Sequence, residues 1–173
     1  MEVILEILKY TIPALIVFLT SYLLIVSQNK NDEKRRHYEL AMTGKKTILP
    51  IRLQAYERLA LLLERISPES IIMRQNLSNL SAKQLQTELL TSIRAEFDHN
   101  LSQQVYVSSE VWERIKNARS NIISLINTAA QQIEPNASAY TLSQKILDMV
   151  MEHKNSLTAP ALVMLKKEAQ EMY

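Results

Sequence analysis

The sequence predicts an all-α protein, with one N-terminal transmembrane helix followed by a compact bundle of about five helices. Three observations favour this fold class. The chain of 173 residues has 1 Gly and 5 Pro, which is low against average usage of about 7% and 5%. It contains no Asn-Gly or Asp-Gly dipeptide of the kind that closes tight β-hairpins. Apolar residues also recur at steps of three and four along most of the chain.

The first predicted element is a transmembrane anchor over residues 1–28. No charged residue occurs between Tyr10 and Val26, and a run of about this length is at the short end of what spans a bilayer. A cleaved signal peptide is a weaker interpretation, because Glu2 and Glu6 stand where a basic start is expected. A buried core helix is also weaker, because a small domain rarely surrounds a strip that is apolar on all sides.

A basic juxtamembrane segment is expected over residues 29–48. Its cations include Lys30, Lys34, Arg35 and Arg36. By the positive-inside rule they predict a single-pass protein of the inner (cytoplasmic) membrane, with the N-terminus outside and the C-terminal domain in the cytoplasm. The same four side chains are candidates for binding anionic lipid headgroups.

A cytoplasmic helical domain is predicted over residues 49–173. Its first helix should begin at Pro50, since a proline at the first helical position sacrifices no hydrogen bond. Tyr56 and Leu63 lie on its apolar face, and Leu59 widens that face beyond a narrow two-helix seam. The "SPES" segment at 67–70 should start a short second helix, because Ser is favoured at the N-cap and Pro just after it.

Two longer helices are expected next. Ser81 and Gln84 have the spacing of a capping box, and Ser108 or Ser109 can cap the longest helix, which Pro135 should end. Their apolar stripes consist of Leu85, Leu89, Ile93 and Phe97 in the first, and of Val111, Ile115, Ala118, Ile122, Leu125, Ala129 and Ile133 in the second.

The last two predicted helices follow shorter signals. Thr141 and Gln144 have the spacing of a second capping box, and Thr158 with Pro160 should start the final helix. No internal repeat and no second helical domain is indicated.

Several chemistries are excluded by composition. The chain has no Cys, which rules out thiolate nucleophiles and Cys-ligated metals. Gly44 is its single glycine, which rules out Gly-rich phosphate loops and leaves no nucleotide-binding motif. The net charge of +2 gives no basis for nucleic-acid binding. No cofactor and no catalytic residue is therefore expected.

One constellation suggests a metal site, within the segment "EFDHN". Glu96 and His99 form an E-x-x-H pair on one helix face, a spacing that di-iron bundles use. Such bundles need two pairs and further carboxylates, whereas neither His37 nor His153 belongs to a second pair. A polar cluster at a helix end is the preferred interpretation, with Asn100 among the residues that bond the chain end.

Aromatic and apolar residues provide the candidates for a partner-binding surface. Tyr106 and Trp112 flank the start of the longest helix, where they form a structural corner or an aromatic anchor at an interface. Tyr56 and Leu59 are further candidates, because they belong to an apolar face wider than one neighbour requires. The expected partner is another protein or a second copy of the chain.

The block "EFDHNLSQQVYVSSEVWERIKNAR", residues 96–119, resembles a segment of an uncharacterised family of bacterial proteins. The resemblance covers most of the chain and implies one N-terminal membrane span with a helical cytoplasmic part. That family has no known activity, so no catalytic residue is transferred. The resulting hypothesis is a non-enzymatic, inner-membrane-anchored helical scaffold or accessory subunit that acts through protein–protein contacts. The alternatives are a metal-dependent enzyme built on Glu96 and His99, and a module that binds anionic lipid surfaces.

Overall fold

A computed structural model describes residues 2–152 and 156–172, with side chains at 15–26, 42, 46–152 and 156–172. The elements in chain order are α1 (Glu2–Arg65), α2 (Pro68–Met73), α3 (Ala82–His99), η1 (Leu101–Tyr106), α4 (Ser109–Gln131), α5 (Ala139–Glu152) and α6 (Ala159–Gln170). No strand occurs in the described ranges, which confirms the all-α prediction. The chain divides into two compact units, Met1–Leu49 and Pro50–Tyr173. The predicted segment boundaries after residues 28 and 48 stay predictions.

The predicted transmembrane anchor is contradicted. Where the structure describes side chains, no helix is long and apolar enough to cross a membrane. The finding also overturns what rested on the anchor, namely the single-pass topology, the inner-membrane location with the N-terminus outside, and the integral membrane contact.

Helix α1 is longer than the sequence predicts. A new helix was expected to begin at Pro50, but α1 is continuous through Pro50 and Gly44 to Arg65. An interior proline removes one backbone hydrogen bond and costs about 3 kcal/mol in an isolated helix. Helix propagation on both sides of Pro50 and the burial of the following turns offset that cost, since Leu59, Leu62 and Leu63 are fully buried.

Local capping signals are mostly confirmed. Ser67 accepts from the Ser70 N–H and caps α2, and Ser108 caps α4 through the Val111 N–H. The capping box at the start of α3 is complete: the Ser81 side chain accepts from the Gln84 N–H, and the Gln84 side chain accepts from the Ser81 N–H.

The predicted capping box of Thr141 and Gln144 is wrong. Helix α5 begins at Ala139, because Ser138 accepts from the Thr141 N–H at 3.2 Å. The Ala139 N–H is in turn fixed by the Leu80 carbonyl at 3.0 Å, which ties the starts of α3 and α5 together. Helix α6 begins after Thr158, as expected, although Thr158 makes no side-chain cap hydrogen bond.

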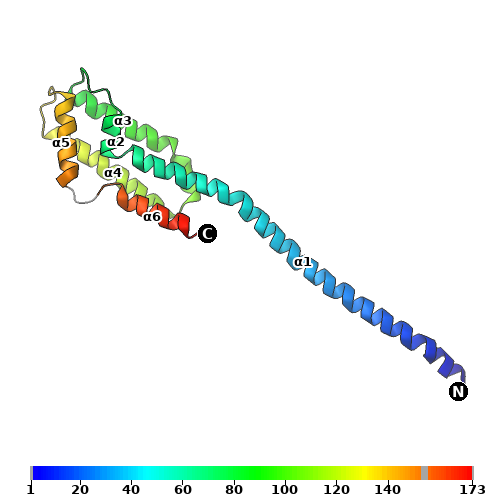
Figure 1. Ribbon diagram of the computed structural model, residues 1–173. Helices are drawn as coiled ribbons and strands as arrows, with labels where there is room; N and C mark the ends of the chain where they lie inside the picture. The colour runs from blue at the N-terminus through cyan, green and yellow to red at the C-terminus, as the bar shows by residue number, and fades with distance from the viewer. Residues whose placement is uncertain (1, 153–155, 173) are drawn as a thin grey trace. The chain divides into compact units, whose positions relative to one another are not determined.

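The core of residues 50–173 lies where the apolar stripes meet. Figure 1 shows α3, α4 and α6 running alongside one another, with α5 across one end. The predicted stripe of α3 is buried in full, and that of α4 is buried from Val111 to Ala129. The end of α1 contributes Tyr56, Leu59, Leu62 and Leu63 to the same cluster, and Ile66 just after the helix also belongs to it. Burial of a stripe on each helix accounts for the choice of faces.

Candidate functional site

Three of the four partner-binding candidates are core residues. Leu59 is fully buried, and Tyr56 and Trp112 are 4% and 8% exposed. The Trp112 ring packs against Phe97, with the ring centroids 5.3 Å apart. The Arg119 guanidinium also contacts Phe97, at 4.3 Å from the centroid of its ring. Such stacked contacts add about 0.5–1.5 kcal/mol to area burial. That these residues contact a partner stays a prediction, and the surface proposed below uses other side chains.

Tyr106, the fourth candidate, belongs to a set of polar contacts around the start of α4. We call Arg52, Tyr56, Tyr106, Ser108 and Glu168 the polar clasp. Glu168 of α6 accepts from the Tyr56 hydroxyl at 2.6 Å, from the Ser108 N–H at 2.9 Å and from the Ser108 hydroxyl. Arg52 donates to the Tyr106 carbonyl at 3.3 Å and to the Tyr56 hydroxyl at 3.1 Å. One carboxylate of α6 thereby joins the end of α1 to the N-terminus of α4.

The clasp changes two pKa values. Burial acts to raise the pKa of Glu168, but the hydrogen bonds from Ser108 and Tyr56 outweigh it and hold the pKa below its usual value. Burial, together with the hydrogen bond to Glu168, raises the pKa of Tyr56, which Arg52 opposes. At neutral pH the arrangement is thus an ionised carboxylate that accepts from a neutral phenol. It is a contact between three helices of the fold.

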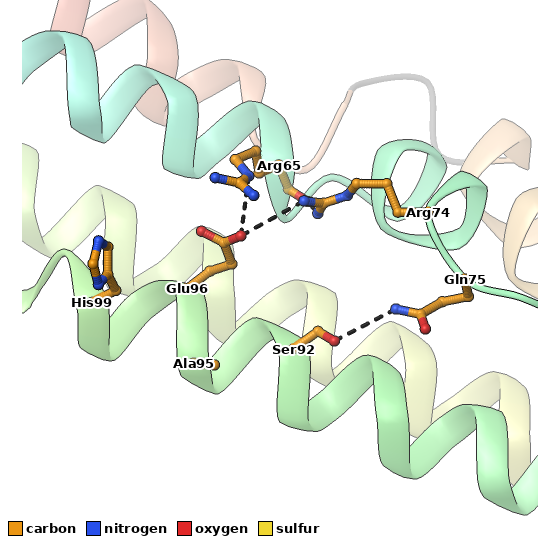
Figure 2. Close-up of a pocket in the computed structure, with 7 residues that line it drawn as sticks. All are labelled: Arg65, Arg74, Gln75, Ser92, Ala95, Glu96 and His99. Carbon is orange, nitrogen blue, oxygen red and sulfur yellow. Dashed lines mark hydrogen bonds and ion pairs between the residues drawn. The ribbon is translucent and has the colours of Figure 1, made fainter.

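A second cluster lies between the end of α1, α2 and α3. Its residues line an open pocket of about 430 Å³, and we call it the arginine pocket: Arg65, Arg74, Gln75, Ser92, Ala95, Glu96 and His99 (Figure 2). Arg65 comes from the last turn of α1, Arg74 follows α2, and Glu96 and His99 come from α3. All three helices therefore end at the pocket.

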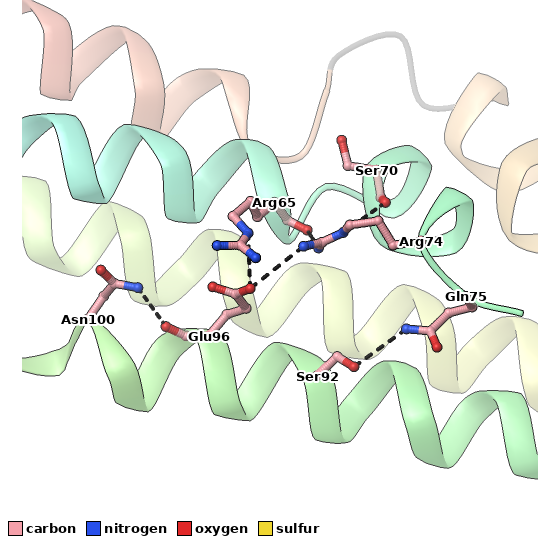
Figure 3. A network of polar contacts seen from close by, with 7 residues as sticks. All are labelled: Arg65, Ser70, Arg74, Gln75, Ser92, Glu96 and Asn100. Atoms are coloured by element: carbon pink, nitrogen blue, oxygen red, sulfur yellow. Dashed lines mark hydrogen bonds and ion pairs between the residues drawn. The ribbon is translucent and has the colours of Figure 1, made fainter.

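Glu96 orients both guanidinium groups of the pocket. One of its carboxylate oxygens lies 3.0 Å from Nε of Arg65 and 3.6 Å from Nη1 of Arg74. Arg74 is fixed further, since it donates from Nε to the Ser70 carbonyl at 3.3 Å and from Nη2 to the Arg65 carbonyl (Figure 3). Gln75 donates to the Ser92 hydroxyl at 3.5 Å across the pocket. The side chain of Glu96 is 18% exposed, whereas that of Arg65 is 57% exposed.

Arg65 retains hydrogen-bonding capacity. It contacts Glu96 through Nε, and within the described residues its terminal Nη1 and Nη2 groups have no partner. A guanidinium carries five N–H donors in a fixed planar fork. The edge of Arg65 that carries the terminal groups is therefore available to a ligand.

The metal interpretation of Glu96 and His99 gains no support from this geometry. Both residues line one pocket, as their spacing predicts. The Glu96 carboxylate, however, faces two guanidinium groups, and their charge disfavours a cation beside it. Among the described residues, no group of three or more His, Asp or Glu side chains is placed to hold a metal ion. Asn100 does bond the chain end as expected, through its side-chain amide to the Glu96 carbonyl at 2.9 Å.

The lipid-headgroup candidates are not placed. The side chains of Lys30, Lys34, Arg35 and Arg36 lie outside the described residues, so this prediction stays untested.

Sequence reasoning missed Arg65, Arg74 and Glu168 as site residues. From the sequence, Arg65 is expected to be an ordinary charge on the solvent-exposed face of a helix, and Arg74 a residue in a polar turn. Glu168 contacts Ser108 across 60 positions of the chain, and no local spacing signals such a contact. The E-x-x-H spacing was the one signal that pointed to the pocket, although it suggested different chemistry.

The fold and the two clusters define an all-helical protein without a recognisable catalytic centre among its described residues. A family model matches residues 2–172, and the chain belongs to that family, described as "Family of unknown function (DUF7935)". The match agrees with the expected membership of an uncharacterised family. It does not show the expected bacterial origin or a membrane anchor. Comparison with curated proteins and comparison with solved structures each found no match.

Proposed function

We propose that the protein is a non-enzymatic scaffold or accessory subunit that binds another protein through the arginine pocket. The observation that carries the proposal is the arrangement of Arg65, Arg74 and Glu96. Two guanidinium groups from separate elements are paired with one carboxylate at the edge of an open pocket, and the terminal N–H groups of Arg65 have no partner among the described residues.

The surface around the pocket supports a protein partner. Leu61 is 54% exposed and lies four residues before Arg65, on the same face of α1. Met73 is 86% exposed and precedes Arg74. Arg and Met are enriched at protein interfaces, and Lys is depleted. The lining residues of the pocket include two Arg and no Lys.

A catalytic role is disfavoured by the state of the pocket's one carboxylate. A general base needs an acceptor free to take a proton from a substrate. Glu96 is instead paired with two cations, at 3.0 Å from Arg65 Nε and 3.6 Å from Arg74 Nη1. The pairing leaves the guanidinium donors as the groups that can face a ligand.

A photo-crosslinking amino acid placed at Ala95 tests the proposal. Ala95 is exposed and lines the pocket, and Gln131, which is exposed at the end of α4, serves as the control position. We expect the full chain to crosslink one identified protein from Ala95 and not from Gln131, and the purified protein to bind the full chain directly. Equal crosslinking from both positions, or no direct binding by the purified protein, would overturn the proposal.

A pair of matched variants assigns the contact to the pocket. Arg65→Gln removes a pocket guanidinium, whereas Arg94→Gln removes an exposed guanidinium on α3 that does not line the pocket. Partner binding should fall in the first variant and remain in the second. The reverse order, or an equal fall in both, would mean that general charge attraction carries the binding.

A further inference from the structure

We propose that the arginine pocket binds a carboxylate group of its partner, through a two-point contact with the terminal Nη1 and Nη2 groups of Arg65. The inference rests on the proposed function and adds the chemistry of what the pocket accepts. It starts from the surplus of donors: Glu96 occupies Nε of Arg65 and Nη1 of Arg74, and the remaining fork of Arg65 faces an open pocket.

The contact geometry favours a planar anion. The Nε group of Arg65 lies 3.0 Å from a carboxylate oxygen of Glu96, which restrains the guanidinium. Its two terminal nitrogens carry parallel N–H groups that match the two oxygens of a carboxylate. A fork held in advance also loses less conformational freedom on binding than a free side chain would.

The charge of the lining selects between anions. Arg65 and Arg74 are positive and Glu96 is negative, so these three side chains together carry a surplus of one positive charge. A carboxylate carries one negative charge and matches that surplus. A phosphate group carries about −1.5 to −2 at pH 7, and its additional charge would face the Glu96 carboxylate.

The pocket also offers groups that can position the rest of the ligand. Ser92 and Gln75 lie across from Arg65, bonded to each other at 3.5 Å, and the exposed Ala95 leaves room beside them. Leu61 is exposed on the same face as Arg65 and can contact apolar parts of a polypeptide. These features favour a Glu or Asp side chain of a protein segment over a free small acid.

The Arg Nε–H resonances of the full chain in NMR spectra measure the contact. The probes are acetate, inorganic phosphate, the blocked peptide acetyl-Ala-Ala-Glu-Ala-Ala-amide and its Gln counterpart, all at constant ionic strength set with chloride. We expect the Arg65 signal to shift with acetate and to saturate at lower concentration with the Glu peptide, while the Arg94 signal and the Gln peptide give no saturable shift. Equal shifts at Arg65 and Arg94, tighter binding of phosphate than of acetate, or no saturation with either carboxylate would overturn the proposal. If acetate bound as tightly as the Glu peptide, the pocket would be assigned to a free small acid. The claim that the carboxylate belongs to a protein segment would then be overturned.

Two variants separate the fork from its charge. Arg65→Lys keeps the positive charge and removes the fork, and Arg65→Gln removes both. We expect each to weaken binding of the Glu peptide about tenfold or more, followed through the Arg74 signal, while Arg94→Gln leaves it unchanged. The thermal midpoint of each variant shows that it is folded. Full binding by folded Arg65→Lys would overturn the two-point contact.

The outcomes separate this inference from the proposed function. If crosslinking at Ala95 captures a directly binding partner but carboxylates do not bind, the pocket remains the partner site and the carboxylate assignment fails. If carboxylates bind at Arg65 but no partner crosslinks from Ala95, the proposed function fails and the anion site remains.

Discussion

The polar clasp and the arginine pocket are each built around one glutamate, yet they use it in opposite ways. Glu168 of the clasp accepts from a backbone N–H and two hydroxyl groups, all of which belong to the fold. Glu96 of the pocket forms ion pairs with two guanidinium groups, one of which has terminal N–H groups with no partner among the described residues. The comparison teaches that a satisfied cluster stabilises a fold, whereas a cluster with surplus donors beside a pocket is suited to binding.

The largest expected effect in this comparison is on stability, from the clasp. Glu168→Ala leaves the Ser108 N–H and the Tyr56 hydroxyl without their acceptor, and we expect the free energy of unfolding to fall by about 1–3 kcal/mol. Chemical denaturation measures it. Glu171→Ala is the control, because Glu171 is exposed and 4.0 Å from Lys167 in a helix-surface pair worth about 0.3–0.5 kcal/mol. Equal losses in the two variants would show that the clasp has no special role.

Acid should weaken the same clasp. The folded-state pKa of Glu168 lies below its usual value of 4.5, so the clasp stabilises the fold above that pH, and the contribution is lost as the pH falls through the folded-state pKa. Thermal midpoints measured between about pH 6 and pH 3 should decline less in Glu168→Gln than in the wild-type protein. Parallel declines would mean that other carboxylates account for the acid response.

A smaller loss is expected from Tyr56→Phe. The substitution keeps the buried ring and removes the hydroxyl that donates to Glu168 and accepts from Arg52. The free energy of unfolding should fall by about 1 kcal/mol, as for one hydrogen bond. In the Glu168→Ala background, Tyr56→Phe should lower the free energy of unfolding by a smaller amount, because the two groups share one contact. Additive losses would contradict the contact.

The smallest expected effect on stability comes from the pocket. Glu96→Gln removes the charge that faces Arg65 and Arg74, whose side chains are 57% and 40% exposed. Because exposed ion pairs contribute about 0–1 kcal/mol, the free energy of unfolding measured by chemical denaturation should fall by no more than that amount. A loss as large as that of Glu168→Ala would make the pocket a structural cluster and remove the distinction drawn here.

The predictability of the two clusters differs for a physical reason. The capping box of Ser81 and Gln84 and the buried stripe of α3 follow from spacings within one helix, so the sequence predicts them. The clasp joins Ser108 to Glu168, and the pocket joins Arg74 to Glu96, through tertiary packing that no local pattern encodes. The prediction that a new helix begins at Pro50 was wrong, because helix continuity and tertiary burial outweighed the local signal of a proline.

The anchor prediction failed because it inferred a membrane span from the length of one apolar run. Its apolar run between Tyr10 and Val26 is at the lower limit for a bilayer, and no helix meets the length and hydropathy required where side chains are described. The domain boundaries and the lipid-headgroup residues were derived from the same run and its basic flank. They remain untested predictions.

Crosslinking from Ala95 in the Arg65→Gln variant, read beside its thermal midpoint, tests the central claim most directly. The claim is that the pocket binds a partner and is not needed for the fold. We predict that the crosslink to the identified partner is lost, that the midpoint stays within the range of Arg94→Gln, and that Arg94→Gln keeps the crosslink. An unchanged crosslink in folded Arg65→Gln would contradict the claim.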